Sequence, residues 1–311
     1  MDFHFTEPQS LTEEEEVKCV YRGDFEDCEE NKNIIVEEGI VEIGESAFRD
    51  FEHLETITLP DSVEIVNACA FSGCKNLKKV TLGKGVKILR DEVFFACSSL
   101  MGITLPSSLE HIGEGCFEAC ASLSDVRFGE GLRSMGSGAF AYCFNLHHLQ
   151  LPDSLVLIEF SAFSNCYSLE SVHLPKELRL LDESLFEGCR SLVDVDLPAG
   201  LLRIARRAFK GCSSLKMLIL PTLLREIGFD AFAGCSSLSR IALPLDLKEI
   251  EDEDIFNACD SLMDISFAGS KEQFEFLTHG KTLTVERSDL TVFTPRMTFL
   301  NLKGKAQGAE I

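Results

Sequence analysis

The chain has 311 residues, and its 51 acidic side chains outnumber its 29 basic ones, which gives a formal net charge of −22 at pH 7. This acidity argues against nucleic acid and anionic membranes as partners, because both require Lys and Arg to neutralise their phosphates. No segment approaches the roughly 18 apolar residues of a membrane-spanning helix, so no membrane insertion is expected.

The acidic residues are concentrated at the N-terminus. The first 46 residues hold 15 Asp and Glu against 3 Lys and Arg, a net charge of −12. Thr12 and Glu15 have the spacing of a capping box, which predicts the start of a short helix, and residues 17–21 form a candidate strand. We interpret residues 1–33 as an acidic cap that covers the open N-terminal end of the stack of sequence repeats that follows in the chain. The alternative is an acidic arm that docks on a basic partner.

The opening residues also bear on where the protein works. Residues 1–8 contain neither a basic region nor an apolar run, so they do not form a secretory signal. The sequence as it stands predicts a cytoplasmic protein. The alternative is a cell-surface or secreted protein, if the chain is exported by another route or if a leader has been removed.

A phenylalanine recurs at a fixed interval through most of the chain. Nine of these residues are spaced by 23 positions, and the tenth follows after 24. A fixed period of this length is the signature of a solenoid of stacked units. We predict ten full repeats within residues 34–268, preceded by one more strand at 34–36. The ladder consists of Phe48, Phe71, Phe94, Phe117, Phe140, Phe163, Phe186, Phe209, Phe232 and Phe256.

Each repeat predicts two short extended segments and a turn. In residues 100–122 the opening segment alternates apolar and polar side chains, as a half-buried strand does, and Pro106 ends it. Leu109 and Ile112 then point inward from a second short strand or extended segment, and a tight turn surrounds the ladder Phe. A unit of 23 residues cannot bury so many apolar side chains alone, so stacked units must share one continuous core.

Nine of the 13 cysteines occupy one position of the repeat. Each thiol there would meet only its copies in the neighbouring repeats, so we interpret the ladder as buried free cysteines that pack as small hydrophobes. A metal–thiolate stack is disfavoured, because zinc prefers four ligands arranged as a tetrahedron. Outside the ladder, Cys19 and Cys28 could pair across a hairpin. The ladder consists of Cys74, Cys97, Cys120, Cys143, Cys166, Cys189, Cys212, Cys235 and Cys259.

The segments L-x-x-I-x-L-P and I-G-x-x-A-F-x-x-C, repeated through residues 34–268, resemble the BspA-type leucine-rich repeat family. The resemblance implies a right-handed solenoid with a parallel β-sheet on one face. It also implies protein binding and cell adhesion, because family members are typically bacterial or protozoan surface proteins that bind host or matrix proteins and other cells.

The period ends after Phe267, and residues 269–311 predict a C-terminal cap and tail. Residues 270–277 have the pattern of a short amphipathic helix, whereas 283–285 and 290–293 have the pattern of strands. Residues 303–311 predict a loose tail. Just before the period ends, the acidic run 251–254 falls in the one repeat with an insertion, and we predict a solvated bulge there.

The outward positions of the first strand are the candidate binding surface, because they vary from repeat to repeat while the inward ladders do not. His148, His173, Asp194 and Asp196 are expected to cluster on three adjacent strands. Imidazoles and carboxylates can bind zinc, and His beside Asp can act as a base. A flat open sheet implies no pocket, however, so a protein-binding patch or an ordinary polar surface is the stronger interpretation.

Beside this polar cluster, Met217 and Ile219 predict an exposed apolar spot, and an apolar spot with a polar rim suits a protein interface. Homotypic packing is one variant of that idea. The complete candidate ligand-binding set is Arg127, His148, Gln150, His173, Asp194, Asp196, Met217 and Ile219.

The predicted fold class is a leucine-rich-repeat-like solenoid, a right-handed stack of ten 23-residue units with a parallel sheet face and little helix. The predicted function is a non-enzymatic module that binds a protein partner through the exposed strand face, without cofactor or metal. No nucleophile elbow, phosphate-cradling glycine loop or zinc-protease motif occurs. The alternative is an intracellular scaffold or a self-associating structural protein, which the missing signal and the free thiols favour.

Overall fold

The computed structural model describes residues 3–4, 19–20, 32–251, 253–279, 282–288 and 292–300. It divides into two compact units, Met1–Leu169 and Glu170–Ile311, called unit 1 and unit 2 below. The predicted helix start at Thr12, the partner thiol Cys28 and the tail at 303–311 lie outside the described residues. None of the helices in the described part has the length and apolar character needed to cross a membrane.

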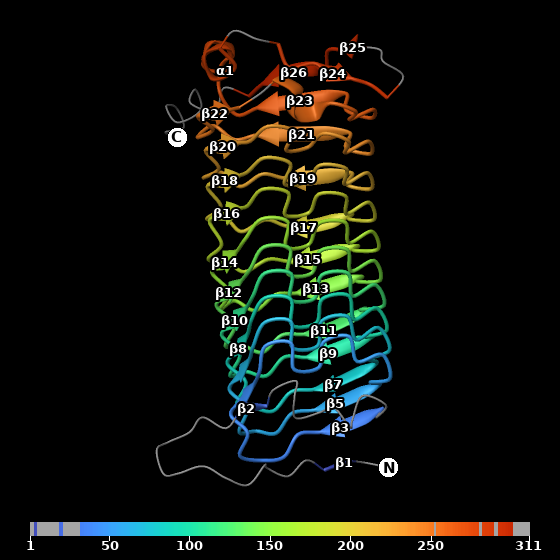
Figure 1. Cartoon of the computed structure of the whole chain (residues 1–311). Coiled ribbons are helices and arrows are strands. Elements are labelled where there is room, and N and C mark those ends of the chain that lie inside the picture. The colour runs from blue at the N-terminus through green and yellow to red at the C-terminus, as the bar shows by residue number, and fades with distance from the viewer. Residues whose placement is uncertain are drawn as a thin grey trace, which may run out of the picture. The chain divides into compact units, whose positions relative to one another are not determined.

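Unit 1 stacks its repeats through two parallel sheets (Figure 1). Each strand pairs with the strand one repeat away, so that Ile34 lies beside Ile57 and Ile57 beside Val80. The first sheet contains β1 (Phe3–His4), β3 (Asn33–Ile35), β5 (Thr56–Thr58), β7 (Lys79–Thr81), β9 (Gly102–Thr104) and β11 (Asp125–Arg127), and β13 (His148–Gln150) lies next to β11.

The second sheet of unit 1 is built from the two-residue strands that follow the proline turn. The candidate strand at 17–21 forms its first member, β2, which pairs in parallel with β4. This sheet contains β2 (Cys19–Val20), β4 (Glu42–Ile43), β6 (Ile65–Val66), β8 (Ile88–Leu89), β10 (His111–Ile112), β12 (Ser134–Met135) and β14 (Leu157–Ile158).

Unit 2 repeats the same arrangement. The prediction of a parallel-strand solenoid with little helix is therefore confirmed, with about ten turns along the chain. Its first strands are β15 (Ser171–His173), β17 (Asp194–Asp196), β19 (Met217–Ile219), β21 (Arg240–Leu243) and β23 (Asp264–Phe267), and its second strands are β16 (Leu180–Leu181), β18 (Arg203–Ile204), β20 (Glu226–Ile227) and β22 (Glu249–Ile250).

The ladder phenylalanines form the centre of the core in both units. All ten are fully buried. In unit 1 the rings of Phe117 and Phe140 stack with centroids 4.8 Å apart, and in unit 2 those of Phe209 and Phe232 stack at 5.8 Å. Offset stacking at such separations adds to the energy of area burial. The period of the sequence is therefore also the period of ring contact.

The ladder cysteines are buried, as predicted, but they do more than fill space. Cys97 donates its thiol proton to the carbonyl oxygen of Phe71 at 3.2 Å, and Cys235 donates to Phe209 at the same distance. The same bond joins each turn to the one before it at Cys74, Cys120, Cys143, Cys166, Cys212 and Cys259. The interpretation of these thiols as small hydrophobes missed this bond.

Each ladder Phe except Phe256 is bracketed by two residues in the left-handed backbone region, and Phe256 has such a residue, Ala258, on one side only. Around Phe48 these are Ser46 and Asp50, with φ of 55° and 59°. Side chains other than glycine enter this region only at a cost. The turn around the Phe demands it nonetheless, and the chain accepts residues as large as Tyr142, with φ of 60°, at one of the two positions.

The C-terminal elements follow the predictions in part. The helix α1 (Lys271–Leu277) begins with a capping box between Ser270 and Gln273. The strands predicted at 283–285 and 290–293 overlap β24 (Val285–Glu286) and β25 (Val292–Phe293), which pair antiparallel. A further strand, β26 (Arg296–Phe299), extends the first sheet of unit 2 in parallel with β23 and was not predicted.

The prediction of a solvated bulge at 251–254 was wrong in part. A short 3-10 helix, η2, spans Glu253–Phe256 and brings Ile255 and Phe256 into the core. The buried apolar pair at its end favours a compact turn over a solvated loop, because the turn keeps Phe256 in the ladder, 5.7 Å from Phe232.

Candidate functional site

The outward side chains of β15, β17, β19, β21 and β23 form the surface that we call the unit 2 strand face. In each of these strands the second residue is buried and its two neighbours point outward, as in the pattern exposed–buried–exposed of β17. The inward residues, Val172, Val195, Leu218, Ile241 and Ile265, belong to the core. The alternation that was predicted from sequence therefore determines which side chains can meet a ligand.

An acidic pair occupies one part of this face. Asp194 and Asp196 are both exposed on β17. Asp196 lies beside the half-buried His173 of β15, and Asp194 lies beside Ser171. Neither carboxylate forms an ion pair with any of the residues that the structure describes. Three of the four residues predicted to cluster thus lie on adjacent strands of unit 2, and the fourth, His148, lies on β13 of unit 1.

Met217 and Ile219 form the apolar spot on the next strand, β19. Their exposed fractions are 66% and 75%, so the structure leaves most of both side chains in water. On the other side of β19, Met217 lies beside Arg240 and Ile219 beside Ala242 of β21. The predicted apolar spot with a polar rim is therefore present within unit 2.

Arg240 is a residue of this face that the candidate set omitted. It is exposed and lies beside Asp264 in the register of β21 and β23. Asp264, however, binds Arg296 of β26, with Nε 2.6 Å from Oδ1. Among the described residues no carboxylate forms an ion pair with Arg240. The outward position in the repeat could have indicated this residue, but the pairing of Asp264 could not be read from the sequence.

The remaining candidates lie on β11 and β13 of unit 1. Arg127 on β11 is exposed, and its Nε lies 3.2 Å from Oδ2 of Asp125 on the same strand. His148 and Gln150 are exposed on β13, the neighbour of β11. This part of the candidate set is a polar stretch with no exposed apolar anchor on its two strands.

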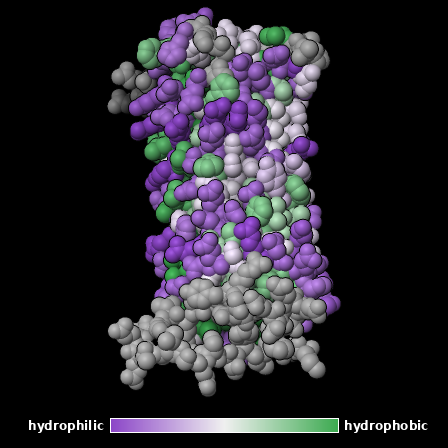
Figure 2. All heavy atoms as spheres, in the orientation of Figure 1, coloured by the Kyte–Doolittle hydropathy of each residue, from purple (hydrophilic) through white to green (hydrophobic). Residues whose placement is uncertain are grey.

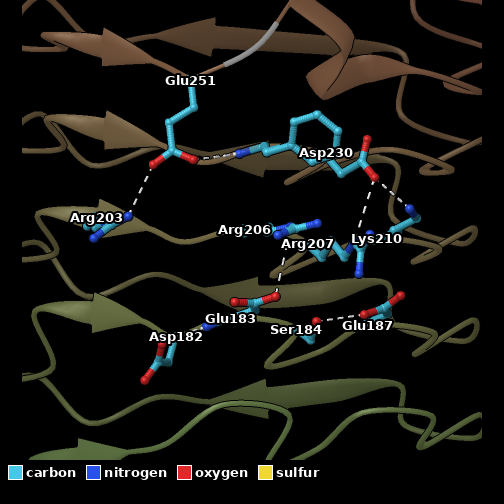
Figure 3. A network of polar contacts seen from close by, with 11 residues as sticks. Asp182, Glu183, Ser184, Glu187, Arg203, Arg206, Arg207, Lys210, Asp230 and Glu251 are labelled. Atoms are coloured by element: carbon cyan, nitrogen blue, oxygen red, sulfur yellow. Dashed lines mark hydrogen bonds and ion pairs between the residues drawn. The ribbon is translucent and has the colours of Figure 1, made fainter.

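The second strands of unit 2 and the turns that follow them carry a contrasting network of paired charges (Figure 3). Arg203 binds Glu251 at 3.1 Å, and Lys210 binds the buried carboxylate of Asp230 at 2.6 Å. Arg206 lies 5.3 Å from the ring centroid of Phe229, at the distance of a cation–π contact. These contacts join successive turns, so we assign this network a structural role.

Hydrophilic side chains with isolated hydrophobic spots cover the described surface seen in Figure 2. Within the described residues no group of three or more His, Cys, Asp or Glu side chains is arranged to hold a metal ion. The zinc hypotheses for the His–Asp cluster and for the thiol ladder therefore gain no support from the geometry. The arrangement on β17, β19 and β21 is suited to contact with another macromolecular surface.

Comparison with known families identifies the repeat. Residues 18–147 and 133–263 match the model described as BspA type leucine rich repeat region, in six copies. No curated protein matches the sequence.

Solved structures of repeat proteins resemble the chain along most of its length. A leucine-rich repeat protein from Bacteroides ovatus is 25% identical, with a TM-score of 0.52, and the match covers 96% of this chain and 91% of that one. The Treponema pallidum leucine rich repeat protein is 26% identical over 67% of this chain and 78% of its own, with a TM-score of 0.44. A leucine rich cell surface protein from Faecalibacterium prausnitzii is 23% identical over 90% and 91%, with a TM-score of 0.43.

Proposed function

The chain belongs to the BspA-type leucine-rich repeat family, and on that premise we propose that it is a non-enzymatic recognition module that binds a protein partner through the unit 2 strand face. The observation that carries the proposal is the exposure of Met217 and Ile219 at the centre of that face. Single exposed apolar residues are common on protein surfaces, but here two of them share one three-residue strand with charged neighbours, which matches an apolar spot inside the polar rim of a protein interface.

The energetic argument rests on the area that a partner would cover. Burying a Met or Ile side chain that is otherwise exposed contributes roughly 1.5 to 3 kcal/mol. Two such side chains together supply roughly 3 to 6 kcal/mol, which offsets much of the cost of association of a modest interface. The outward residues of β17 and β21 would surround them as a polar rim.

The charged neighbours would give the interaction its selectivity. Asp194 and Asp196 favour a partner that places basic side chains opposite β17, and His173 can donate or accept a hydrogen bond beside them. We assign these polar residues to specificity and the apolar pair to affinity.

The test compares two substitutions that both replace an exposed apolar side chain by a carboxylate. Ile219→Asp changes the strand face, whereas Phe276→Asp changes α1, where Phe276 is 84% exposed. The tagged native chain is used to recover bound protein from the source cells, and the recovered partner is then titrated against the native chain and against each variant. We expect Ile219→Asp to weaken binding about tenfold or more, with the melting temperature unchanged and Phe276→Asp behaving as the native chain. If the Ile219→Asp chain bound the partner as tightly as the native chain does, the unit 2 strand face would not be the binding site.

A further inference from the structure

We propose that the partner of the unit 2 strand face is a second copy of the same chain, which binds face to face about a two-fold axis parallel to β19. This inference rests on the proposed function, because it uses the same face. It goes further in naming the partner, the symmetry and the residues that would meet.

The order of charges across three neighbouring strands is the first observation. Asp194, Met217 and Arg240 occupy the same position of three successive repeats, 23 residues apart, and all three are exposed. Met217 and Arg240 are register partners, and β17 is the neighbour of β19 on the other side. Along the stacking direction the face is therefore acidic on one strand, apolar on the next and basic on the third. Neighbouring strands are about 4.8 Å apart.

Such an order is self-complementary under one rotation. A two-fold axis along β19 places the apolar strand over its own copy and exchanges the strands on either side. Asp194 of each copy then opposes Arg240 of the other, while Met217 and Ile219 meet their own counterparts. An isologous interface of this kind makes every contact between two different residues twice, so it contains two copies of the same salt bridge.

The other in-plane rotation is unfavourable for this face. An axis along the stacking direction would place β17 over its own copy with the strand reversed. Asp194 would then oppose Asp196 of the second copy, twice over, in a partly dehydrated interface. Like charges opposed across an interface are costly, so the charges select the first rotation over the second.

The two charges that this contact requires, those of Asp194 and Arg240, are available to a second copy. Asp194 and Arg240 form no ion pair within the described residues, although Arg240 lies beside a carboxylate. That carboxylate, Asp264, is held by Arg296 at 2.6 Å. On the next strands out, the rotation brings Ser171 opposite Asp264 and His173 opposite Ser266 of the second copy, which adds polar groups and no like-charged pair.

The size of the face predicts the strength of association. Three residues per strand at about 3.3 Å each and five strands at about 4.8 Å define a contact of roughly 10 by 20 Å. This area is well below the roughly 800 Å² per partner of a standard stable interface. We therefore expect a weak dimer whose population rises with protein concentration and in which each charge pair matters.

Sedimentation of the purified full-length chain tests the inference through charge reversal. Asp194→Arg alone sets two arginines against each other, and Arg240→Asp alone sets two aspartates against each other. Each variant should therefore associate about tenfold more weakly than the native chain. An equal mixture of the two variants pairs Arg with Asp at both contacts and should form mixed dimers again. Glu249→Arg on β22, which makes the same charge change on the second sheet, should associate as the native chain does.

The rescue in the mixture keeps the experiment independent of folding, because a misfolded variant cannot be restored by a second one. A native chain that stays monomeric up to millimolar concentration would overturn the inference. So would a mixture that associates no better than its components. If either result came with a different protein that binds the native chain and not the Ile219→Asp chain, the proposed function would stand without the dimer. If neither a second copy nor another protein depended on Ile219, both proposals would fail.

Discussion

The thiol sulfur of Cys120 lies 3.1 Å from the carbonyl oxygen of Phe94, 26 residues earlier in the chain. The same oxygen accepts the backbone N–H of Cys97, also at 3.1 Å. One carbonyl therefore closes the turn of its own repeat and binds the thiol of the next. This double role accounts for cysteine at a fully buried position, because alanine would lack the donor.

Substitution of Cys120 by alanine should remove this bond and leave a small void. We expect a loss of about 1 to 2 kcal/mol in the free energy of unfolding, measured by urea denaturation. Raman spectroscopy of the thiol stretch provides the control. The intensity lost on Cys120→Ala should lie at the lower frequency of a hydrogen-bonded thiol. Loss at the frequency of a free thiol would contradict the assignment.

Alkaline pH should unfold the chain through the same ladder. Desolvation raises the pKa of the Cys120 thiol from 9.0 to about 12, and burial also raises those of Cys97 and Cys143 well above the ordinary value. A thiol with a raised pKa stabilises the fold below its unfolded pKa, and this contribution is lost as pH rises towards the folded pKa. Stability should therefore fall between about pH 9 and pH 12. Maleimide labelling of Cys120 at pH 8 without denaturant, as fast as that of half-exposed Cys69, would argue against burial.

The phenylalanine ladder should be the energetic centre of unit 1. Phe140 is fully buried and stacks between Phe117 and Phe163, with centroid separations of 4.8 and 5.8 Å. Phe140→Ala should cost about 3 to 5 kcal/mol as a core cavity, and denaturant titration would measure it. A loss below roughly 1 kcal/mol would show that the ladder is not the core.

The left-handed positions beside each Phe should respond to glycine and alanine in opposite ways. Gly138 has φ of +61°, and an added Cβ would meet no atom closer than 3.6 Å, so Gly138→Ala tests backbone strain alone. We expect it to lower stability by about 1 kcal/mol. Ala119, with φ of 59°, is a left-handed alanine on the other side of its ladder residue, Phe117. Ala119→Gly should be neutral or stabilising by up to about 1 kcal/mol, because released strain exceeds the added chain entropy. Equal losses at both sites would contradict this account.

Much of the fold could be predicted because a single period specified it. The strand after Leu100, the turn at Pro106 and the buried Phe117 each follow from one repeat and then recur. The hydrogen bond of the ladder thiols was not predicted, because its acceptor is a backbone oxygen and the side-chain pattern does not reveal which backbone oxygen a thiol reaches. The left-handed residues were missed because side chains as different as Ser46 and Tyr142 occupy them.

The candidate site, too, could be predicted from the sequence only in part. The outward direction of Asp194, Met217 and Ile219 followed from strand alternation, and the structure confirms it. The role of Arg240 could not be predicted, because it depends on β26 holding Asp264 through Arg296. That strand returns to the sheet 32 residues after Asp264, outside the period. Binding by the eight candidate residues stays a prediction until a partner is measured.

Photo-crosslinking from the strand face tests the central claim most directly. A benzoylphenylalanine is placed at Ile219 in one chain and at Glu249, on β22 of the second sheet, in a control chain. After irradiation in the source cells, we predict a discrete protein adduct from position 219 and none from position 249. An adduct of twice the chain's mass would identify a second copy, and another mass would identify a different partner. No adduct from position 219, or the same adduct from both positions, would contradict recognition through the unit 2 strand face.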